Sequence, residues 1–352
     1  MKKILVIGPS WVGDTMLMQP MLLRLKQRHP GCRIAVLAPP WTAALLHAMP
    51  EVHEVIINPF PHGALNLVAR YRLGKRLRDA QYDRAIVLPN SLKSALVPFF
   101  ARVPVRTGFV GEARYGLLND ARRLRKADLP LMVERFAQLA EDAQGEIPRP
   151  LANPRLEVSA SRRSATLQKL GLVLDRPVAV FCPGAEYGPA KRWPANYFAE
   201  IAQRLQHRGY AVWLVGSAKD KEVADKIIAL GNSECINLCG ITDLTDAIAL
   251  LSSAQVVISN DSGLMHLAAA LDRPMLALFG SSSPQFTPPL SPYADILKLD
   301  MECSPCFKRE CPLGHFNCMK LLTPDLVWKQ LQRAITAETT INHGTHGIMI
   351  KE

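Results

Sequence analysis

Residues 258–266, Ile-Ser-Asn-Asp-Ser-Gly-Leu-Met-His, place a polar turn between two apolar runs. The run before the turn predicts the end of a strand, and the run after it predicts the start of a helix. Asp261 or Ser262 can accept a hydrogen bond from an amide of the first helical turn, and the remaining amides and the helix dipole favour a bound anion. A nucleotide diphosphate fits such a turn, and a helix cap without a ligand is the alternative interpretation.

A second polar segment, Gly8-Pro-Ser-Trp-Val-Gly-Asp14, follows the first apolar run of the chain. Asp14 stands where this segment enters a predicted helix, so its carboxylate can serve as a general base or can cap the helix. The glycines allow the backbone to approach a ligand closely. Their spacing is not Gly-x-Gly-x-x-Gly, however, so the segment does not predict a nicotinamide site.

A third polar segment covers residues 181–194 and carries two adjacent cations, Lys191 and Arg192, directly before Trp193 and Pro194. Proline is favoured in the first turn of a helix, so the cations stand just before a predicted helix start. Paired positive charges at such a place suit a diphosphate leaving group. An exposed basic loop is the alternative.

Four of the eight cysteines, Cys303, Cys306, Cys311 and Cys318, cluster with His315. Cys303-Ser-Pro-Cys306 has the spacing of a zinc or iron–sulfur ligand pair, although the spacing of the four thiols is irregular. The cluster therefore has two interpretations, a structural metal site or a loop of reduced thiols. A metal here would hold the segment after residue 286 in shape and would take no part in catalysis.

Apolar runs of strand length alternate with longer segments of helix-like composition, which predicts parallel sheets with crossover helices. The predicted strands are residues 4–7, 34–37, 55–57 and 85–88, followed by 178–181, 212–215, 256–258 and 275–278. The predicted helices include residues 16–28, 65–78, 195–208, 219–230 and 244–252. The polar segments above follow strands of this pattern, so we expect ligand sites at the carboxyl ends of the sheets.

The alternation is interrupted near residue 145, where residues 145–154 contain three prolines and suit an extended linker. A chain of 352 residues is long enough for two domains. We therefore predict an N-terminal α/β domain over residues 1–150 and a second over residues 151–336. Residues 337–352 read as a weakly ordered tail.

The net charge of +11 is concentrated in the first predicted domain. Residues 1–150 contain 22 Lys and Arg against 12 Asp and Glu, a net charge of +10. Two basic clusters stand out: Arg70, Arg72, Lys75, Arg76 and Arg78, and then Arg122, Arg123, Arg125 and Lys126. Aromatic residues do not interleave with them as a nucleic-acid stacking platform requires, which leaves an anionic partner, an acidic membrane surface or a solvated surface.

No segment approaches the roughly 20 uninterrupted apolar residues that span a bilayer. The apolar run at residues 3–7 ends at Gly8-Pro9 and is too short for the hydrophobic region of a signal peptide. We therefore expect a soluble cytoplasmic protein.

Three segments together resemble the ADP-heptose:lipopolysaccharide heptosyltransferases: residues 8–14, residues 183–194 and residues 260–266. The likeness extends from residue 3 to about residue 331 and includes Leu88-Pro-Asn-Ser-Leu-Lys, Arg114-Tyr-Gly-Leu-Leu-Asn and Phe286-Thr-Pro-Pro-Leu. The resemblance implies a GT-B fold, in which two Rossmann-like domains face a central cleft. The second domain would hold the nucleotide sugar and the first would hold the acceptor.

The resemblance also implies a reaction, the transfer of a heptose from ADP-heptose to the lipopolysaccharide inner core with inversion at the anomeric carbon. Within the family the likeness is greatest to the transferase whose acceptor is the first heptose on Kdo-lipid A. Asp14 matches the family's proposed catalytic base, and Lys191 matches a lysine that contacts the donor. The remaining donor-binding positions implied by the resemblance are Glu186, Tyr187, Arg192, Thr242, Asp261, Ser262, Gly263 and His266.

No Asp-x-Asp pattern for a metal-bound diphosphate occurs in the sequence, so we expect catalysis without a metal or other cofactor. The partners implied are ADP-heptose and the anionic inner-core acceptor, with peripheral contact at the cytoplasmic face of the inner membrane and no nucleic acid. A GT-B transferase of another nucleotide sugar is the nearest alternative. A basic nucleic-acid-binding protein stabilised by a metal at the cysteines is a second alternative, and a nicotinamide dehydrogenase is a third.

Overall fold

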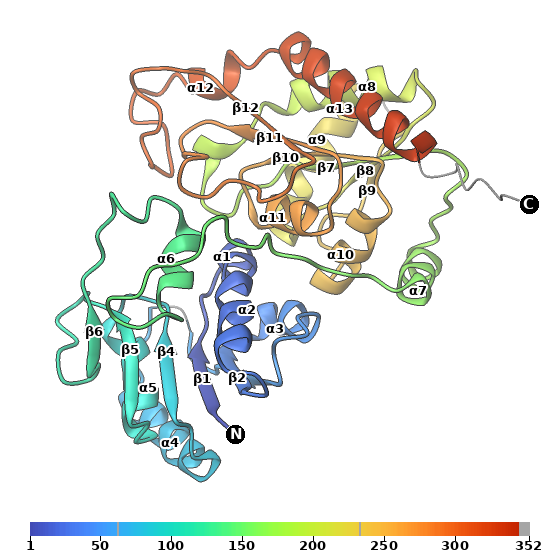
Figure 1. Cartoon of the computed structure of the whole chain (residues 1–352). Helices are drawn as coiled ribbons and strands as arrows, with labels where there is room; N and C mark the ends of the chain where they lie inside the picture. Colours follow the sequence, from blue (N-terminus) through green and yellow to red (C-terminus); the bar gives the residue numbers. More distant parts are fainter. Residues whose placement is uncertain (62, 232–233, 345–352) are drawn as a thin grey trace, which may run out of the picture. The chain divides into compact units, whose positions relative to one another are not determined.

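The computed structural model describes residues 1–61, 63–231 and 234–344 and divides the chain into two compact units (Figure 1). Unit 1 contains Met1–Pro154 together with Gln285–Thr287, and unit 2 contains the rest of the chain. The division after Pro154 lies at the end of the proline-rich segment 145–154, four residues beyond the boundary that we predicted after residue 150. The inclusion of Gln285–Thr287 in unit 1 was not predicted.

Unit 1 is built on a parallel six-stranded sheet in the order β3-β2-β1-β4-β5-β6. Its strands are β1 (Lys3–Ile7), β2 (Arg33–Ala38), β3 (Glu54–Ile57), β4 (Arg84–Val87), β5 (Val105–Phe109) and β6 (Asp120–Arg122). Its helices are α1 (Val12–Leu17), α2 (Gln19–Arg28), α3 (Pro40–His47), α4 (Leu67–Leu77), α5 (Leu92–Phe100) and α6 (Met132–Gln138). All four predicted strands are present, and β5 and β6 extend the sheet beyond them.

Side chains along the strands of unit 1 alternate between the two faces of the sheet, and helices cover both faces. Leu5 and Ile7 of β1 and Val87 of β4 share a core cluster with Leu73 of α4 and Val97 of α5. The intervening strand residues are buried as well, so every central strand reads as a continuous apolar run. This pattern is typical of a parallel sheet with helices on both faces.

Unit 2 repeats this architecture with the sheet order β12-β11-β10-β7-β8-β9. The strands are β7 (Val178–Cys182), β8 (Ala211–Leu214), β9 (Ile236–Asn237), β10 (Val256–Asn260), β11 (Met275–Phe279) and β12 (Ala294–Lys298). The helices are α7 (Ala160–Leu170), α8 (Ala195–Gln206), α9 (Lys221–Gly231), α10 (Leu244–Ser252), α11 (Gly263–Ala270), α12 (Asn317–Lys320) and α13 (Pro324–Gly344). Numbered within its own unit, each sheet has the strand order of a Rossmann fold.

The strand order reverses beside the first strand of each unit, between β1 and β4 and between β7 and β10. Ligands of doubly wound sheets bind at such reversal points, outside the carboxyl ends of the strands. Two of the three polar segments singled out in the sequence follow β1 and β7, and the turn after β10 is the third. The fold therefore brings the last two together in unit 2.

Helix α13 covers residues 337–344, where the sequence predicts a weakly ordered tail. Residues 325–343 contain no glycine and no proline, so nothing in the sequence ends the helix before Gly344. Residues 345–352 of the predicted tail lie outside the described residues. Among the helices of the described part of the chain, none is both long and apolar enough to cross a membrane.

Candidate functional sites in the two units

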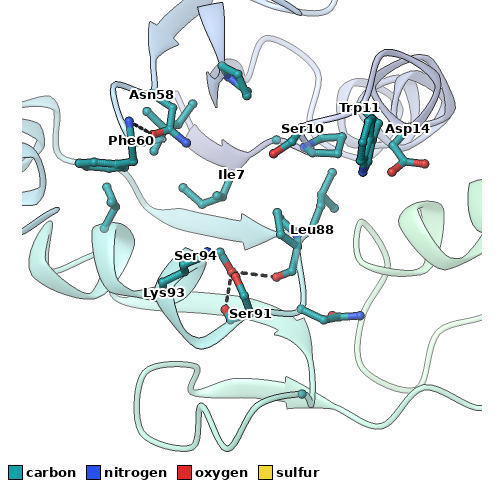
Figure 2. A pocket seen from close by; sticks show the side chains of 18 of the residues that line it. Ile7, Ser10, Trp11, Asp14, Asn58, Phe60, Leu88, Ser91, Lys93 and Ser94 are labelled. Carbon is teal, nitrogen blue, oxygen red and sulfur yellow. Dashed lines mark hydrogen bonds between the residues drawn. The ribbon is translucent and has the colours of Figure 1, made fainter. Parts of the chain in front are cut away.

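Unit 1 contains a pocket of about 660 Å³ at the reversal point of its sheet (Figure 2). The loop after β1 supplies Ser10 and Trp11, and the loop after β4 supplies Asn90 and Ser91. The wall also includes Asn58, which accepts a hydrogen bond from the amide of Phe60 at 3.0 Å. A few polar groups among apolar and aromatic side chains are the lining expected for a small-molecule ligand.

Asp14 lies in the first turn of α1, is half-buried and lines the pocket of unit 1 (Figure 2). The N-cap residue of α1 is Trp11, whose side chain makes no capping hydrogen bond. Asp14 is the third residue of the helix, so both interpretations of the sequence, a general base and a residue that supports the helix end, stay predictions. Because the amino end of a helix favours an anion, the first turn of α1 is a suitable place for a carboxylate.

Three cations line the same pocket, Arg70, Lys93 and Arg135. The Arg135 guanidinium lies 4.5 Å from the ring centre of Phe286, which belongs to the short segment of unit 1 at residues 285–287. The Phe286 carbonyl accepts a hydrogen bond from the amide of Met132, at 2.9 Å. This separate stretch of chain therefore holds Arg135 in place beside the pocket.

Arg114 supports the pocket from behind and is almost fully buried. Its guanidinium donates to the carbonyls of Pro89 at 2.6 Å and Phe109 at 2.5 Å, and to the side chain of Asn90 at 3.0 Å. Burial lowers the pKa of Arg114 to about 10, so the side chain stays charged at neutral pH. It fixes the loop after β4, a role that the sequence did not indicate although Arg114 opens one of the recognised motifs.

In unit 2, Lys191 and Asp261 come together at the reversal point and form an ion pair. Lys191 ends a short 3₁₀ turn, Pro189–Lys191, and Asp261 directly follows β10. Ser262 is the N-cap residue of α11, but its side chain caps no amide. The prediction that Asp261 or Ser262 caps this helix is therefore wrong. The Asp261 carboxylate pairs with Lys191 instead, and the Ser262 side chain accepts no hydrogen bond from a first-turn amide.

His266 lies on the first turn of α11 and is buried. Desolvation lowers its pKa to about 4, with a further lowering by Lys191 and an opposing effect of Asp261. The imidazole is therefore neutral at neutral pH. Of the predicted donor-binding residues, the structure brings Lys191, Asp261, Ser262, Gly263 and His266 to one place.

Asn260 joins the two loops of this site, although we predicted no separate role for it. Its side-chain oxygen accepts from the amide of Trp193 at 3.1 Å, and its side-chain nitrogen donates to the carbonyl of Pro183 at 2.7 Å. Asn260 is fully buried, so both bonds are protected from water. One side chain thus ties the end of β10 to both ends of the loop after β7.

The other predicted donor-binding residues lie in this loop or farther along the sheet. Glu186 pairs with Lys219 on the surface, and Arg192 lies 3.9 Å from Asp220. Thr242 follows β9 at the edge of the sheet, where its hydroxyl donates to the carbonyl of Leu238 at 3.1 Å. Strand β8 lies between β9 and β7 in the sheet, so Thr242 follows a strand that is farther from the reversal point than β7, and its role stays a prediction.

The loop that carries Lys191 packs on residues 303–318, which we call the cysteine-rich segment. The Tyr187 hydroxyl donates to the carbonyl of Phe307 at 2.8 Å, and the Ala190 amide donates to the carbonyl of Arg309 at 3.0 Å. The Tyr187 ring also lies 5.1 Å from the Lys191 ammonium and 5.3 Å from the Arg309 guanidinium. The segment thereby supports the backbone on both sides of Gly188.

The cysteine thiols of this segment surround a small space that His315 also lines. Burial raises the pKa of Cys318, and the neighbouring thiols Cys303, Cys306 and Cys311 raise it further. Across residues 1–61, 63–231 and 234–344, no three His, Cys, Asp or Glu side chains are arranged to hold a metal ion. Both interpretations of the cluster, a structural metal site and a loop of reduced thiols, stay predictions.

Comparison with known proteins agrees with this architecture. Residues 70–317 match the model of glycosyltransferase family 9 (heptosyltransferase). The chain is 50% identical over 345 residues to lipopolysaccharide heptosyltransferase 2 of Salmonella typhimurium, covering 96% of this chain and 99% of that protein. It is 49% identical to the protein of the same name in Escherichia coli, with the same coverage.

The solved structure of E. coli ADP-heptose lps heptosyltransferase II superposes with a TM-score of 0.88 at 46% identity, covering 96% of this chain and 100% of that one. The predicted α/β fold of the GT-B class, with two Rossmann-like domains, is therefore confirmed. By sequence, by fold and by the place of its polar loops, the chain belongs to glycosyltransferase family 9, the heptosyltransferases.

Proposed function

We propose that this glycosyltransferase moves L-glycero-D-manno-heptose from ADP-heptose to the first heptose of the Kdo-lipid A inner core during lipopolysaccharide biosynthesis. The observation that carries the proposal is the identity of about half over nearly the whole chain to enzymes named lipopolysaccharide heptosyltransferase 2. Both units contribute to that identity, so it covers the regions to which we assign the donor and the acceptor.

We assign the donor to unit 2. The ammonium of Lys191 lies at the start of α11, where the helix dipole and the first-turn amides add positive potential. Asp261 holds Lys191 in place, and the neutral His266 adds no charge to the site. Because the diphosphate becomes more negative as the sugar leaves, these groups stabilise the departing ADP more than the bound donor.

The remaining donor contacts are assigned by resemblance. Arg192, Glu186 and Tyr187 lie in the loop that carries Lys191, within reach of a ligand at the end of β7. Thr242 remains a weaker candidate because it follows the edge strand β9. Sugar choice depends on a few hydroxyl contacts, so these positions are where we expect discrimination between ADP-heptose and other nucleotide sugars.

We assign the acceptor to the pocket of unit 1, with Asp14 as the general base. In one displacement, the acceptor hydroxyl oxygen bonds to the anomeric carbon, the bond from that carbon to the diphosphate breaks, and Asp14 takes the hydroxyl proton. The anomeric configuration inverts because the attack comes from the face opposite the leaving group. Lys93 and Arg135 give the pocket a positive character that suits an anionic inner core.

Neutralisation of the leaving group by Lys191 and helix amides requires no metal ion, so we expect the reaction to proceed in EDTA. The donor is a water-soluble nucleotide sugar and the acceptor is anchored in a bilayer. We therefore place the enzyme at the cytoplasmic face of the inner membrane, in peripheral contact with it. No role in nucleic-acid binding is assigned.

Release of ADP from ADP-heptose, measured with a heptose-bearing Kdo-lipid A acceptor and EDTA, tests the function. We expect release that depends on the acceptor, is lost in Asp14→Asn and is kept in the exposed control Asp79→Asn. Donor binding, followed by calorimetry, should survive Asp14→Asn because that residue lies in unit 1. Near-normal turnover in Asp14→Asn would remove Asp14 as the base, and release with a different sugar donor alone would refute the substrate assignment.

A further inference from the structure

Helix α4 of unit 1, labelled in Figure 1, has large exposed apolar side chains at and just before its amino end. The exposed fractions are 52% for Leu65, 49% for Leu67, 63% for Val68 and 43% for Tyr71. Four large apolar side chains within seven residues are more than the scattered single exposures that a soluble surface normally carries. Such a cluster of exposed apolar side chains indicates a surface that binds a partner.

The opposite side of α4 is firmly packed, so the exposure does not come from a loosely attached helix. Leu73 is buried in the core of unit 1. Gly74 lies so close to α5 that a Cβ there would be 2.5 Å from the Cβ of Phe100. The Arg70 guanidinium is turned inward, 4.1 Å from the ring centre of Phe60, and donates to the carbonyl of Leu65 at 2.6 Å.

The apolar surface continues from α4 onto α5. The Tyr71 and Phe100 ring centres are 5.4 Å apart, and those of Phe100 and Phe99 are 5.6 Å apart. Phe99 is itself exposed, and the Arg106 guanidinium lies 5.5 Å from its ring centre. The outward aromatic rings therefore form one continuous strip with the apolar end of α4.

The charged side chains from residue 55 to residue 78 are all positive. Residues 55–78 contain five Lys and Arg and no Asp or Glu. Arg70 and Arg78 are bound to backbone carbonyls, Arg78 to that of Phe100 at 2.9 Å. Arg72, Lys75 and Arg76 are the exposed three.

We name the outward residues of this region the α4 face. Its members are Leu65, Leu67, Val68, Tyr71, Arg72, Lys75, Arg76 and Phe99. We propose that the α4 face docks on a bilayer surface that contains anionic lipid. Apolar and aromatic side chains that enter the headgroup region, together with cations that meet lipid phosphates, are the composition of an interfacial helix.

The α4 face adjoins the pocket of unit 1. Phe60, Gly63 and Arg70 line that pocket, and Arg70 is also the residue whose inward turn fixes the start of α4. On the proposed function, the acceptor sugar is linked to acyl chains in the bilayer. Docking through the α4 face would then present the pocket beside the surface from which the acceptor projects.

Binding of the full chain to vesicles of phosphatidylethanolamine and phosphatidylglycerol, compared with vesicles of phosphatidylcholine, tests the proposal. One cation near an anionic surface contributes about fivefold to partitioning, so the triple variant Arg72→Gln, Lys75→Gln, Arg76→Gln should bind about a hundredfold more weakly. The triple variant Arg162→Gln, Lys226→Gln, Lys329→Gln removes the same charge from exposed positions of unit 2 and should bind like the parent.

The apolar contribution has its own pair of variants. Leu65→Ser, Leu67→Ser, Val68→Ser should lower vesicle binding at least about tenfold, since each side chain loses apolar area that would leave water. The control Val173→Ser, Leu174→Ser, Leu230→Ser changes exposed residues of unit 2 and should have no effect. All four variants should release ADP normally with a deacylated, water-soluble acceptor.

Equal binding of the parent to anionic and neutral vesicles would overturn the proposal, as would unchanged vesicle binding by the α4-face variants. A dimer in solution that these variants abolish, without vesicle binding by the parent, would mean that a second copy covers the face. Failure of the proposed transferase reaction would show as absent ADP release in every variant and would leave the vesicle results standing.

Discussion

Replacement of Gly188 by alanine should disturb the donor loop without touching a charged group. A Cβ at this position would lie 2.5 Å from the carbonyl oxygen of Arg309, in the cysteine-rich segment. Ordinary van der Waals contacts begin at 3.4 Å, so the two segments must separate by roughly 0.9 Å. The hydrogen bond from the Ala190 amide to the same oxygen, now 3.0 Å, would then be lost.

The magnitude follows from these two effects. Loss of one hydrogen bond lowers the free energy of unfolding by about 1 kcal/mol. Displacement of Lys191 by most of an ångström should lower kcat/KM for ADP-heptose by about 10- to 100-fold, since misplacement of a catalytic group by about 1 Å can reduce rate a hundredfold. Tyr187→Phe, which removes one bond and adds no atom, should lower kcat/KM less.

Steady-state ADP release at varied ADP-heptose, with urea unfolding of the same preparations, measures both effects. Gly209→Ala is the matched control, because it strains a left-handed turn in unit 2 where an added Cβ meets no atom within 4 Å. That variant should lose stability and keep its kinetics. A Gly188→Ala enzyme with the parent's kcat/KM would refute the coupling between the cysteine-rich segment and the donor loop.

Three further predictions concern buried charged or titratable groups. Lys191→Ala leaves the buried Asp261 carboxylate without its cation, so the free energy of unfolding in urea should fall by about 3 kcal/mol, and calorimetry should show weaker ADP binding. The double variant Lys191→Ala, Asp261→Asn should regain the stability but not the ADP binding. The pKa of His266 is about 4 in the folded protein and 6.5 in the reference state, so the unfolded chain binds more protons between these values. The free energy of unfolding should therefore fall by about 3 kcal/mol from pH 7 to pH 4, and His266→Gln should lack this part of the loss. Arg114→Met leaves several buried acceptors unpaired and should lower the free energy of unfolding by about 3 kcal/mol, whereas the exposed Arg125→Met should have little effect.

Much of the sheet architecture was predictable because the central strands are apolar on both faces. Such strands stand out in the sequence as continuous runs, as residues 256–258 do. Strand β5 (Val105–Phe109) was missed because Arg106, Thr107 and Gly108 interrupt its apolar character. Strand β6 (Asp120–Arg122) was missed because three polar or small residues at the edge of a sheet carry no such signal.

The candidate site of unit 2 was predictable from its turn, since the residues that follow β7 and β10 must meet wherever these strands are neighbours. Which contacts they make was not. The sequence allowed Asp261 to cap α11, and only the folded chain shows that Lys191 takes that carboxylate. Asn260 was overlooked because its role depends on two backbone groups about 70 residues away in the sequence.

The orientation of the basic residues also could not be predicted from the sequence. Arg70 and Arg122 belong to predicted surface clusters but are buried, with guanidinium groups bound to carbonyls and, for Arg122, to Asp120. Arg72 has the same residue type and neighbours of the same kind, yet it points outward. Helix rotation decides this, and the rotation is set by close packing such as that of Gly74 against α5.

The division of the chain limits how this enzyme can be recombined with its relatives. All residues that line the pocket of unit 1, to which we assign the acceptor, lie between Ile7 and Phe136, while the Lys191 group lies wholly in unit 2. Chimaeras that exchange donor or acceptor preference between family members are therefore feasible by exchanging whole units. A single crossover after Pro154 would take residues 285–287 from the other parent, including the position of Phe286, on which Arg135 is stacked. Gene fusions that preserve the pocket must carry residues 285–287 with the unit to which they belong.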